Sequence, residues 1–353
     1  MDKAPGIVAL LGSGETSAAG GLVFEAVVRR LDSRPTIGIL ETPAGFELNT
    51  HRVAGRVAEY LSTRLQNFQP QIRLIPARKR NTSFSPDDPE ICAGILSSNL
   101  IFFGPGSPSY TVRQLAGSLA WGYIQAMHRL GSSLALASAA TIALGTKALP
   151  VYEIYKVGED PHWKPGLDLF APYGLSLVII PHWNNSEGGT EVDTSRCFVG
   201  RQRLDPLLAQ LEKHITVIGL DEHTGLIIDM AGEVCQVLGK GEIHLVKGGV
   251  EQSYLNDTSF SIRELGDYHP LPDIRVGIDG AVWEKALAAR PTSGEAEPDP
   301  LPPIEVMEML EYRHQARLAK EWQKSDALRD RILQTGWKVN DTPDGQKLQR
   351  SDQ

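Results

Sequence analysis

The stretch Leu134–Gly145, LALASAATIALG, places one small polar residue between two apolar segments. The run before Ser138 is short and apolar, as in a buried strand, and a helix is predicted over Ala139–Lys147. A strand that passes directly into a helix is the repeating unit of a parallel sheet covered by helices. Ser138 then lies either where a helix packs closely on the sheet or where a nucleophile is raised above it. The stretch alone leaves both interpretations open.

Short apolar runs alternate with longer amphipathic segments throughout the first half of the chain. We predict strands over the runs GIVALLG, TIGILETP and LIFFG, at 6–12, 36–43 and 100–104. We predict helices over 20–31, 52–65 and most of 110–130, where apolar residues recur at helical spacing. This alternation indicates an α/β fold, a three-layer sandwich with a mostly parallel sheet. In such sheets functional residues lie at the carboxyl ends of the strands.

The pattern changes after Pro150, and it changes again near the C-terminus. A strand is predicted over Leu175–Trp183, a helix follows, and glycine-containing turns then separate short β-rich runs that indicate hairpins at a sheet edge. The segment 289–303 contains five prolines and is predicted to be an extended linker. We therefore divide the chain into an α/β domain at 1–288, this linker, and a small helical hairpin at 304–353.

Composition and charge exclude several classes of protein. The 353 residues carry a formal net charge of −8, which argues against broad nucleic-acid binding by the whole chain. No apolar run approaches the roughly 20 residues of a membrane span, so no membrane partner is expected. The three cysteines are widely spaced and form no C-x-x-C pair, so we expect reduced thiols, a cytoplasmic location and no metal. Gly12 and Gly14 match only half of a dinucleotide fingerprint, and no cofactor is predicted.

Ser138 is a candidate nucleophile only if a base and an orienting carboxylate accompany it. The residues around it, LASAA, lack both glycines of the G-x-S-x-G nucleophile motif. His182 is the best candidate base because it follows an apolar strand and precedes a polar loop. Glu153 is the candidate orienting carboxylate, although a solvated loop glutamate is an equal alternative. His223, in the cluster Asp221–His223, is the second candidate base. A polar cluster in a surface hairpin turn explains these three residues about as well.

The loop GPGSPSYTVRQL, at 104–115, joins a predicted strand to a predicted helix. Backbone N–H groups in such a loop point to an oxyanion site, and an ordinary connection is the alternative. The donors that this loop offers are the backbone N–H groups of Gly106 and Ser107. Ser107 in this loop, Asn184 in the loop after His182, and Arg201 are the residues that we expect to bind substrate.

Together these segments resemble the peptidase E and cyanophycinase family of serine hydrolases. The matching segments are LGSGE, FFGPGSPSYTVRQL, the SAA turn at Ser138, and the region containing Gly174, Leu175, His182, Arg201, Arg203 and Leu204. The resemblance covers residues 6–245 and implies a class I glutamine amidotransferase-like fold. It also implies Ser138 as nucleophile, His182 as base, Glu153 as the acid, and oxyanion N–H groups from Gly106 and Ala139. Leu136, Ala137 and Ala140 depart from the family's pattern around the serine.

The C-terminal segment is similar to the end of cysteinyl-tRNA synthetase. The matching residues are Arg313, Arg317, Lys320, Trp322, Asp326, Arg329, Asp330, Gly336, Asp341, Thr342, Pro343, Asp344 and Gly345. No catalytic motif of that enzyme is present. We therefore expect a serine hydrolase of peptide or other amide bonds that acts through an acyl-enzyme. The alternative is an inactive binding protein whose C-terminal segment contacts tRNA or a protein partner. The sequence also allows this segment to pack on the rest of the chain, and it allows the protein to form a homo-oligomer.

Overall fold

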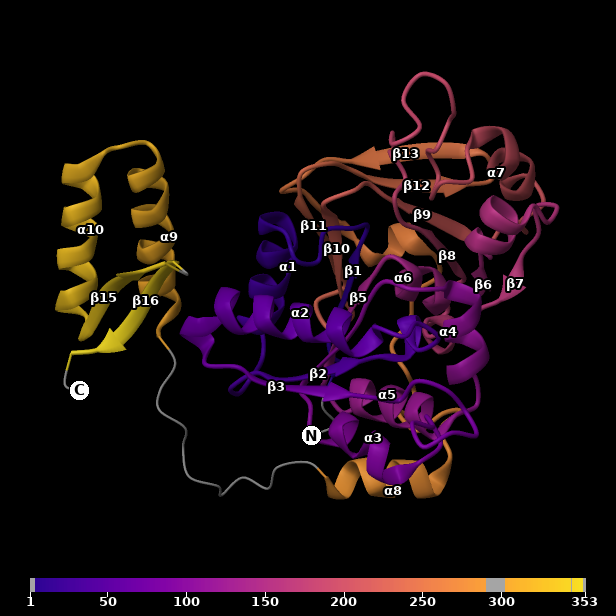
Figure 1. Ribbon diagram of the computed structural model, residues 1–353, viewed down its shortest axis with the longest axis horizontal. Helices are drawn as coiled ribbons and strands as arrows, with labels where there is room; N and C mark the ends of the chain where they lie inside the picture. Colours follow the sequence, from indigo (N-terminus) through magenta and orange to yellow (C-terminus); the bar gives the residue numbers. More distant parts are fainter. Residues whose placement is uncertain (1–3, 290–301, 344, 352–353) are drawn as a thin grey trace.

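The computed structural model describes residues 4–289, 302–343 and 345–351, and its centre is an eight-stranded sheet (Figure 1). The order of the strands is β14-β11-β10-β1-β5-β4-β2-β3. The five parallel strands are β1 Val8–Leu11, β5 Ser133–Ala137, β4 Leu100–Phe103, β2 Thr36–Leu40 and β3 Gln71–Ile75. The antiparallel strands are β10 Thr224–Asp229, β11 Val234–Gly239 and β14 Ser259–Ser261. The predicted α/β fold with a large, mostly parallel sheet is confirmed.

Helices cover both faces of this sheet. The helices on one face are α1 Ala18–Val28 and α2 Thr50–Arg64, and those on the other are α3 Pro89–Leu96, α5 Leu119–Arg129 and α8 Gly280–Ala288 (Figure 1). Alternate side chains of β1 serve the two faces: Val8 and Leu10 pack toward α3 and α5, whereas Ala9 and Leu11 pack toward α1 and α2. Because both faces are covered, the central strands are continuous apolar runs.

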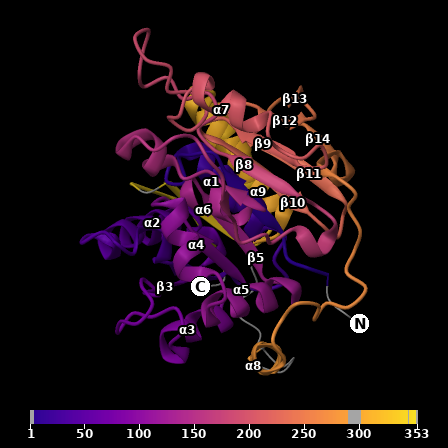
Figure 2. The ribbon, with the colours of Figure 1, turned by 90° about the vertical axis from the view of Figure 1, so that its right-hand side faces the viewer.

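A second sheet of four strands, in the order β13-β12-β9-β8, lies beside the antiparallel edge of the first (Figure 2). Its strands are β8 Leu177–Ile180, β9 Thr216–Leu220, β12 Ile243–Lys247 and β13 Val250–Tyr254. Nearby elements are α4 Pro108–Leu115, α6 Ala139–Leu144, α7 Arg201–Leu208 and the short pair β6 Lys147–Ala148 and β7 Lys164–Pro165. The chain passes from β9 in this sheet to β10 in the first through the turn 221–223. This turn therefore lies where the two sheets meet.

The C-terminal elements form a small unit on the side of α1 and α2 (Figure 1). They are α9 Ile304–Leu318, α10 Trp322–Gln334, and the antiparallel pair β15 Trp337–Thr342 and β16 Gly345–Arg350. Asn67, which follows α2, accepts a hydrogen bond from the Leu348 N–H at 2.8 Å and donates one to the Gln346 carbonyl at 3.0 Å. Val306 and Leu310 join the apolar cluster beneath α1 and α2. Most of the predicted linker, 290–301, and the predicted turn residue Asp344 lie outside the described residues.

An ion pair holds the C-terminal unit together. The guanidinium of Arg313 is buried and donates to both carboxylate oxygens of Asp341, at 2.8 and 2.9 Å. These two residues belong to the sequence resemblance noted for this segment, and their pairing links α9 to the β-hairpin. None of the helices in the described ranges combines the length and the apolarity that crossing a membrane requires.

Candidate functional site

Ser138 occupies the one-residue turn between β5 and α6. Its backbone has φ 51° and ψ −116°, a conformation that residues with a Cβ adopt only under strain. The strained turn forms although Leu136 and Ala140 stand where glycines were expected, and both of these side chains are fully buried. The serine itself is partly exposed at the carboxyl end of the strand. Backbone strain of this kind concentrates at functional sites, so the turn is itself a reason to examine the neighbours of Ser138.

His182 follows β8 and reaches Ser138 from the second sheet. Its Nε2 lies 3.0 Å from the Ser138 Oγ, which is a hydrogen-bonding distance. Its backbone is also left-handed, with φ 51°. The Nδ1 on the other side of the ring lies 2.9 Å from the Oε1 of Glu222. Hydroxyl, imidazole and carboxylate thus form a continuous hydrogen-bonded chain.

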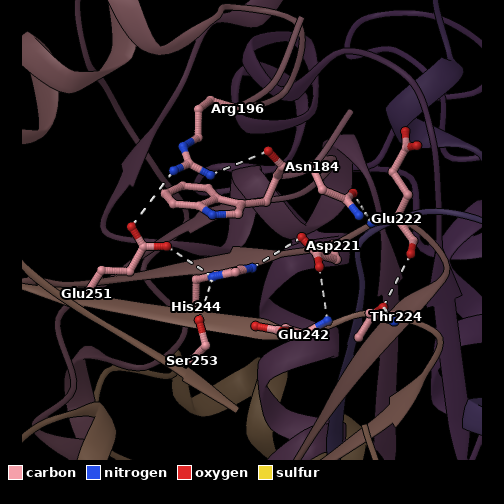
Figure 3. Close-up of polar contacts among 11 residues, drawn as sticks. Asn184, Arg196, Asp221, Glu222, Thr224, Glu242, His244, Glu251 and Ser253 are labelled. Atoms are coloured by element: carbon pink, nitrogen blue, oxygen red, sulfur yellow. Dashed lines mark hydrogen bonds and ion pairs between the residues drawn. The ribbon is translucent and has the colours of Figure 1, made fainter. Parts of the chain in front are cut away.

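Glu222 lies in the turn between β9 and β10 and is held by two asparagines. Asn185 Nδ2 donates to the Glu222 Oε1 at 2.9 Å. Figure 3 shows the other contact, in which the Asn184 Oδ1 accepts from the Glu222 backbone N–H at 2.9 Å. Burial alone raises the pKa of Glu222, but the hydrogen bonds from His182 and Asn185 outweigh it and leave the pKa below its ordinary value. The carboxylate is therefore ionised at neutral pH. Asn184, predicted to bind substrate, holds this glutamate in place.

The carboxylate that the structure places against His182 is Glu222, and not Glu153, which was predicted for this position. Glu153 begins a π-helical turn, Glu153–Val157, and its Oε1 forms an ion pair with Lys164 Nζ at 3.1 Å. The resemblance implied an acid between Ser138 and His182 along the chain. The fold instead supplies one from a later turn, because β9 lies beside β8. In the sequence, Glu222 belongs to the cluster Asp221–His223, which was considered only as a second candidate. Its position at the end of a predicted strand is the signal that could have identified it.

The loop after β4 has, at Gly106, a backbone shape that only glycine permits. Gly106 has φ 151°, and a Cβ at this position would collide with the Pro43 carbonyl. Ser107, predicted to bind substrate, is instead the N-cap of α4: its Oγ accepts from the Tyr110 N–H at 3.2 Å, and the residue is buried. Ala139 is the first residue of α6, and the N–H groups of a first turn have no acceptor inside the helix.

A second polar network lies next to the His182–Glu222 pair. Figure 3 shows Arg196, Glu251, His244 and Asp221 connected in that order. His244 Nε2 lies 3.2 Å from Asp221 Oδ1, and its Nδ1 lies 3.0 Å from Glu251 Oε1. The Trp183 ring stacks on His244 with centroids 5.6 Å apart. Trp183 and Asp221 directly adjoin His182 and Glu222, so the network supports the backbone at both residues.

Arg201, the third residue predicted to bind substrate, is the first residue of α7. Its N–H donates to Asp193 Oδ2 at 2.9 Å, and the residue lines a cavity that also contacts Trp183 and Arg196. That cavity is on the α7 side of the second sheet. Within the described residues, no three His, Cys, Asp or Glu side chains converge so as to hold a metal ion.

Comparison with solved structures shows the fold. The chain is similar to a peptidase from an acI-B1 Actinobacterium, with a TM-score of 0.59, 23% sequence identity, and coverage of 74% of this chain and 98% of that one. No family model matches the chain. About three quarters of the chain thus share the fold of a solved peptidase structure.

Comparison with curated proteins matches only a short stretch. The chain is 41% identical over 51 residues to the cysteine–tRNA ligase of Methanosarcina mazei, and 44% identical over 48 residues to that of Caldicellulosiruptor saccharolyticus. These stretches are 14% of this chain and 11% and 10% of the two relatives. The chain therefore spans about a tenth of the length of the curated relatives that it matches.

Proposed function

We propose that the protein is a serine hydrolase that cleaves peptide or other amide bonds through an acyl-enzyme. The observation that carries this proposal is the chain Ser138–His182–Glu222, with contacts of 3.0 and 2.9 Å, built on a strained turn at the serine. The fold shared with a solved peptidase supports it. We also propose that the fold is of the class I glutamine amidotransferase type, as the resemblance implies.

In the proposed mechanism each of these three groups has a role. His182 Nε2 accepts the Ser138 hydroxyl proton as Oγ attacks the carbonyl carbon, and the same nitrogen then delivers that proton to the leaving amine. Glu222 accepts a hydrogen bond from Nδ1–H and stabilises the imidazolium that forms between these two steps. Water then attacks the acyl ester, His182 accepts a proton from it, and the carboxylic acid product leaves as Ser138 regains its hydrogen.

The developing oxyanion requires hydrogen-bond donors beside Ser138. The N–H of Ala139 belongs to the uncapped first turn of α6, whose dipole favours negative charge. We propose Gly106 as the second donor, as the resemblance implies. Its φ of 151° and the nearby Pro43 carbonyl leave no room for a side chain at this position. Each such donor contributes about 10²- to 10³-fold to the rate in enzymes of this type.

A fluorophosphonate probe tests this proposal directly, because it forms a stable adduct only with an activated serine. We expect the native protein to be labelled at neutral pH, and a protein unfolded in urea not to be. Mass spectrometry of a digest should place the adduct on Ser138. An adduct on another serine, or no adduct at all, would contradict the proposal.

A second proposal concerns the C-terminal unit: we propose that it binds tRNA. The observation favouring it is the 51-residue similarity to a cysteine–tRNA ligase, together with an exposed Trp322 that carries the Arg317 guanidinium 5.8 Å above its ring. Exposed aromatic rings beside cations are typical of surfaces that stack nucleic-acid bases. Residues 304–353 contain nine acidic and nine basic residues, so the net negative charge of the chain lies elsewhere.

Filter binding of bulk tRNA to the full-length protein tests this second proposal. We expect binding that weakens as salt rises from 50 to 200 mM, because phosphate contacts release counterions. The double variant Lys320→Glu, Trp322→Ala should bind more weakly and respond less to salt. A control variant, Lys240→Glu, changes a charge outside the unit and should bind like the wild type. Salt-independent binding, or equal binding by all three proteins, would contradict the proposal that the C-terminal unit binds tRNA.

A further inference from the structure

A cavity of about 590 Å³ lies on the α7 side of the second sheet, away from the Ser138 turn. This volume is within the roughly 300–1,000 Å³ of small-molecule sites. Its apolar lining residues are Trp183, Leu208, Leu211, Ile215, Val217 and Val246. Two glycines, Gly248 and Gly249, form the β12–β13 turn at its edge. The cavity therefore suits a ligand with an apolar body.

The charged residues around the cavity are three cations and three acids. They are Arg196, Arg201, Lys213, Asp205, Glu212 and Glu251. Two of the acids already have partners: Glu212 pairs with Lys147 at 3.4 Å, and Glu251 with His244 at 3.0 Å. Among the residues that the structure describes, the charge around the cavity that has no partner there is therefore mainly positive, and a negatively charged ligand would balance it. Arg201 and Lys213 stand exposed at the rim, where they attract an anion as it approaches.

Arg196 is the residue that singles out this cavity as a binding site. It is only 7% exposed, yet its polar contacts are long: Nη1 lies 3.5 Å from the Trp183 carbonyl and Nη2 lies 3.8 Å from Glu251 Oε2. Its Nε has no partner within the described residues. A guanidinium has five N–H donors, and a buried one requires close acceptors to offset its lost hydration. Burial accordingly lowers the pKa of Arg196.

The ring of Trp183 forms the other side of the same site. The Arg196 guanidinium lies 3.4 Å from the centroid of this ring, which fixes the plane of its donors. A planar guanidinium held in this way matches the two oxygens of a carboxylate. The apolar lining then accommodates the rest of such a molecule, so the chemistry on both sides of the cavity selects a carboxylic acid with an apolar body.

The site is connected to His182 through two backbone hydrogen bonds. The N–H of Arg196 donates to the Trp183 carbonyl at 3.0 Å, and the N–H of Cys197 donates to the His182 carbonyl at 3.1 Å. Arg196, Cys197 and Phe198 are consecutive left-handed residues, with φ between 58° and 67°. The Phe198 ring contacts the His182 ring, with centroids 5.2 Å apart. A ligand that moves Arg196 therefore moves a strained turn that is hydrogen-bonded to the backbone of His182.

We propose that this cavity binds a small carboxylic acid with an apolar body, and that its occupancy alters the reactivity of Ser138. The second clause rests on the proposed hydrolase function, whereas the first does not. The reaction proposed for this chain releases carboxylic acids, so a product fits the site by its chemistry.

Calorimetric titration of the full-length Ser138→Ala protein with N-acetyl-L-leucine tests binding without turnover. We expect saturable binding, weakened on the order of tenfold or more in Arg196→Gln and with the uncharged N-acetyl-L-leucinamide. Arg201→Gln, at the exposed rim, should weaken binding without affecting folding. Arg203→Gln, exposed on the same helix outside the cavity, is the matched control and should bind like the parent. If the heat of titration does not saturate, or if Arg196→Gln binds the acid as tightly as its parent, the proposed binding site is wrong.

The rate of fluorophosphonate labelling of the Ser138-containing protein tests coupling. We expect N-acetyl-L-leucine to change the labelling rate several-fold in the wild type and not in Arg196→Gln. Labelling that proceeds at the same rate with and without the acid overturns coupling and leaves the hydrolase proposal standing. Absence of any labelling overturns the hydrolase proposal and the coupling together, while the calorimetry still decides whether the cavity binds the acid.

Discussion

Replacing Ser138 with alanine is expected to lower kcat for amide hydrolysis by about 10⁴- to 10⁶-fold. The loss is large because Ser138 Oγ is the atom that His182 Nε2 contacts at 3.0 Å, and without it no acyl-enzyme forms. Residual rate would come from the oxyanion donors and from binding alone. The measurement is the rate on the best member of a library of fluorogenic peptide amides, together with fluorophosphonate labelling.

Two further variants make this result specific. Ser186 is an exposed serine in the loop after His182, and Ser186→Ala should keep full activity and labelling. Ser138→Gly should be as inactive as Ser138→Ala but more stable than the wild type by about 1 kcal/mol, since glycine adopts φ 51° and ψ −116° without strain. Chemical denaturation measures this difference. Labelling of Ser138→Ala at the wild-type rate would show that another nucleophile reacts.

The fold was predictable from the sequence to the level of its class. The central strands are buried on both faces, and their sequences are accordingly short continuous apolar runs separated by helices. The lateral order of the strands was not predictable, since it depends on pairings between distant segments. For the same reason the β-rich region after residue 214 indicated hairpins without showing that β9 and β10 belong to different sheets.

The candidate site was predictable in part. Ser138 and His182 each follow an apolar strand, which is a position typical of functional residues. The sequence did not show that the two strands belong to different sheets. The carboxylate that contacts His182 was missed. Asp221 and Glu222 are neighbours in one turn, and the sequence does not show which histidine each of them contacts. In the structure they separate: Asp221 contacts His244, and Glu222 contacts His182. Asn185, which holds Glu222, has a polar side chain like many loop residues and carried no distinguishing signal.

Replacing Glu222 with glutamine is expected to lower kcat by about 10³- to 10⁴-fold, as when the orienting acid of a serine hydrolase loses its charge. The amide keeps the shape of the side chain, but it no longer stabilises the imidazolium and no longer selects the tautomer with hydrogen on Nδ1. Glu153→Gln is the matched control, because Glu153 pairs with Lys164 and should affect kcat by no more than a few-fold. A large loss of kcat in Glu153→Gln with little loss in Glu222→Gln would instead identify Glu153 as the orienting acid.

Stability measurements separate the electrostatic role of Glu222 from its role in catalysis. Its pKa in the folded protein lies below the ordinary value, because the hydrogen bonds from His182 and Asn185 outweigh the effect of burial. The unfolded chain therefore binds this proton more tightly, and the interaction stabilises the fold above the ordinary glutamate pKa. That contribution disappears as the pH falls through the lower, folded-state pKa. The free energy of unfolding should accordingly fall more between pH 7 and pH 3 for the wild type than for Glu222→Gln. Equal declines in the two proteins would mean that Glu222 is not held as an ionised partner of His182.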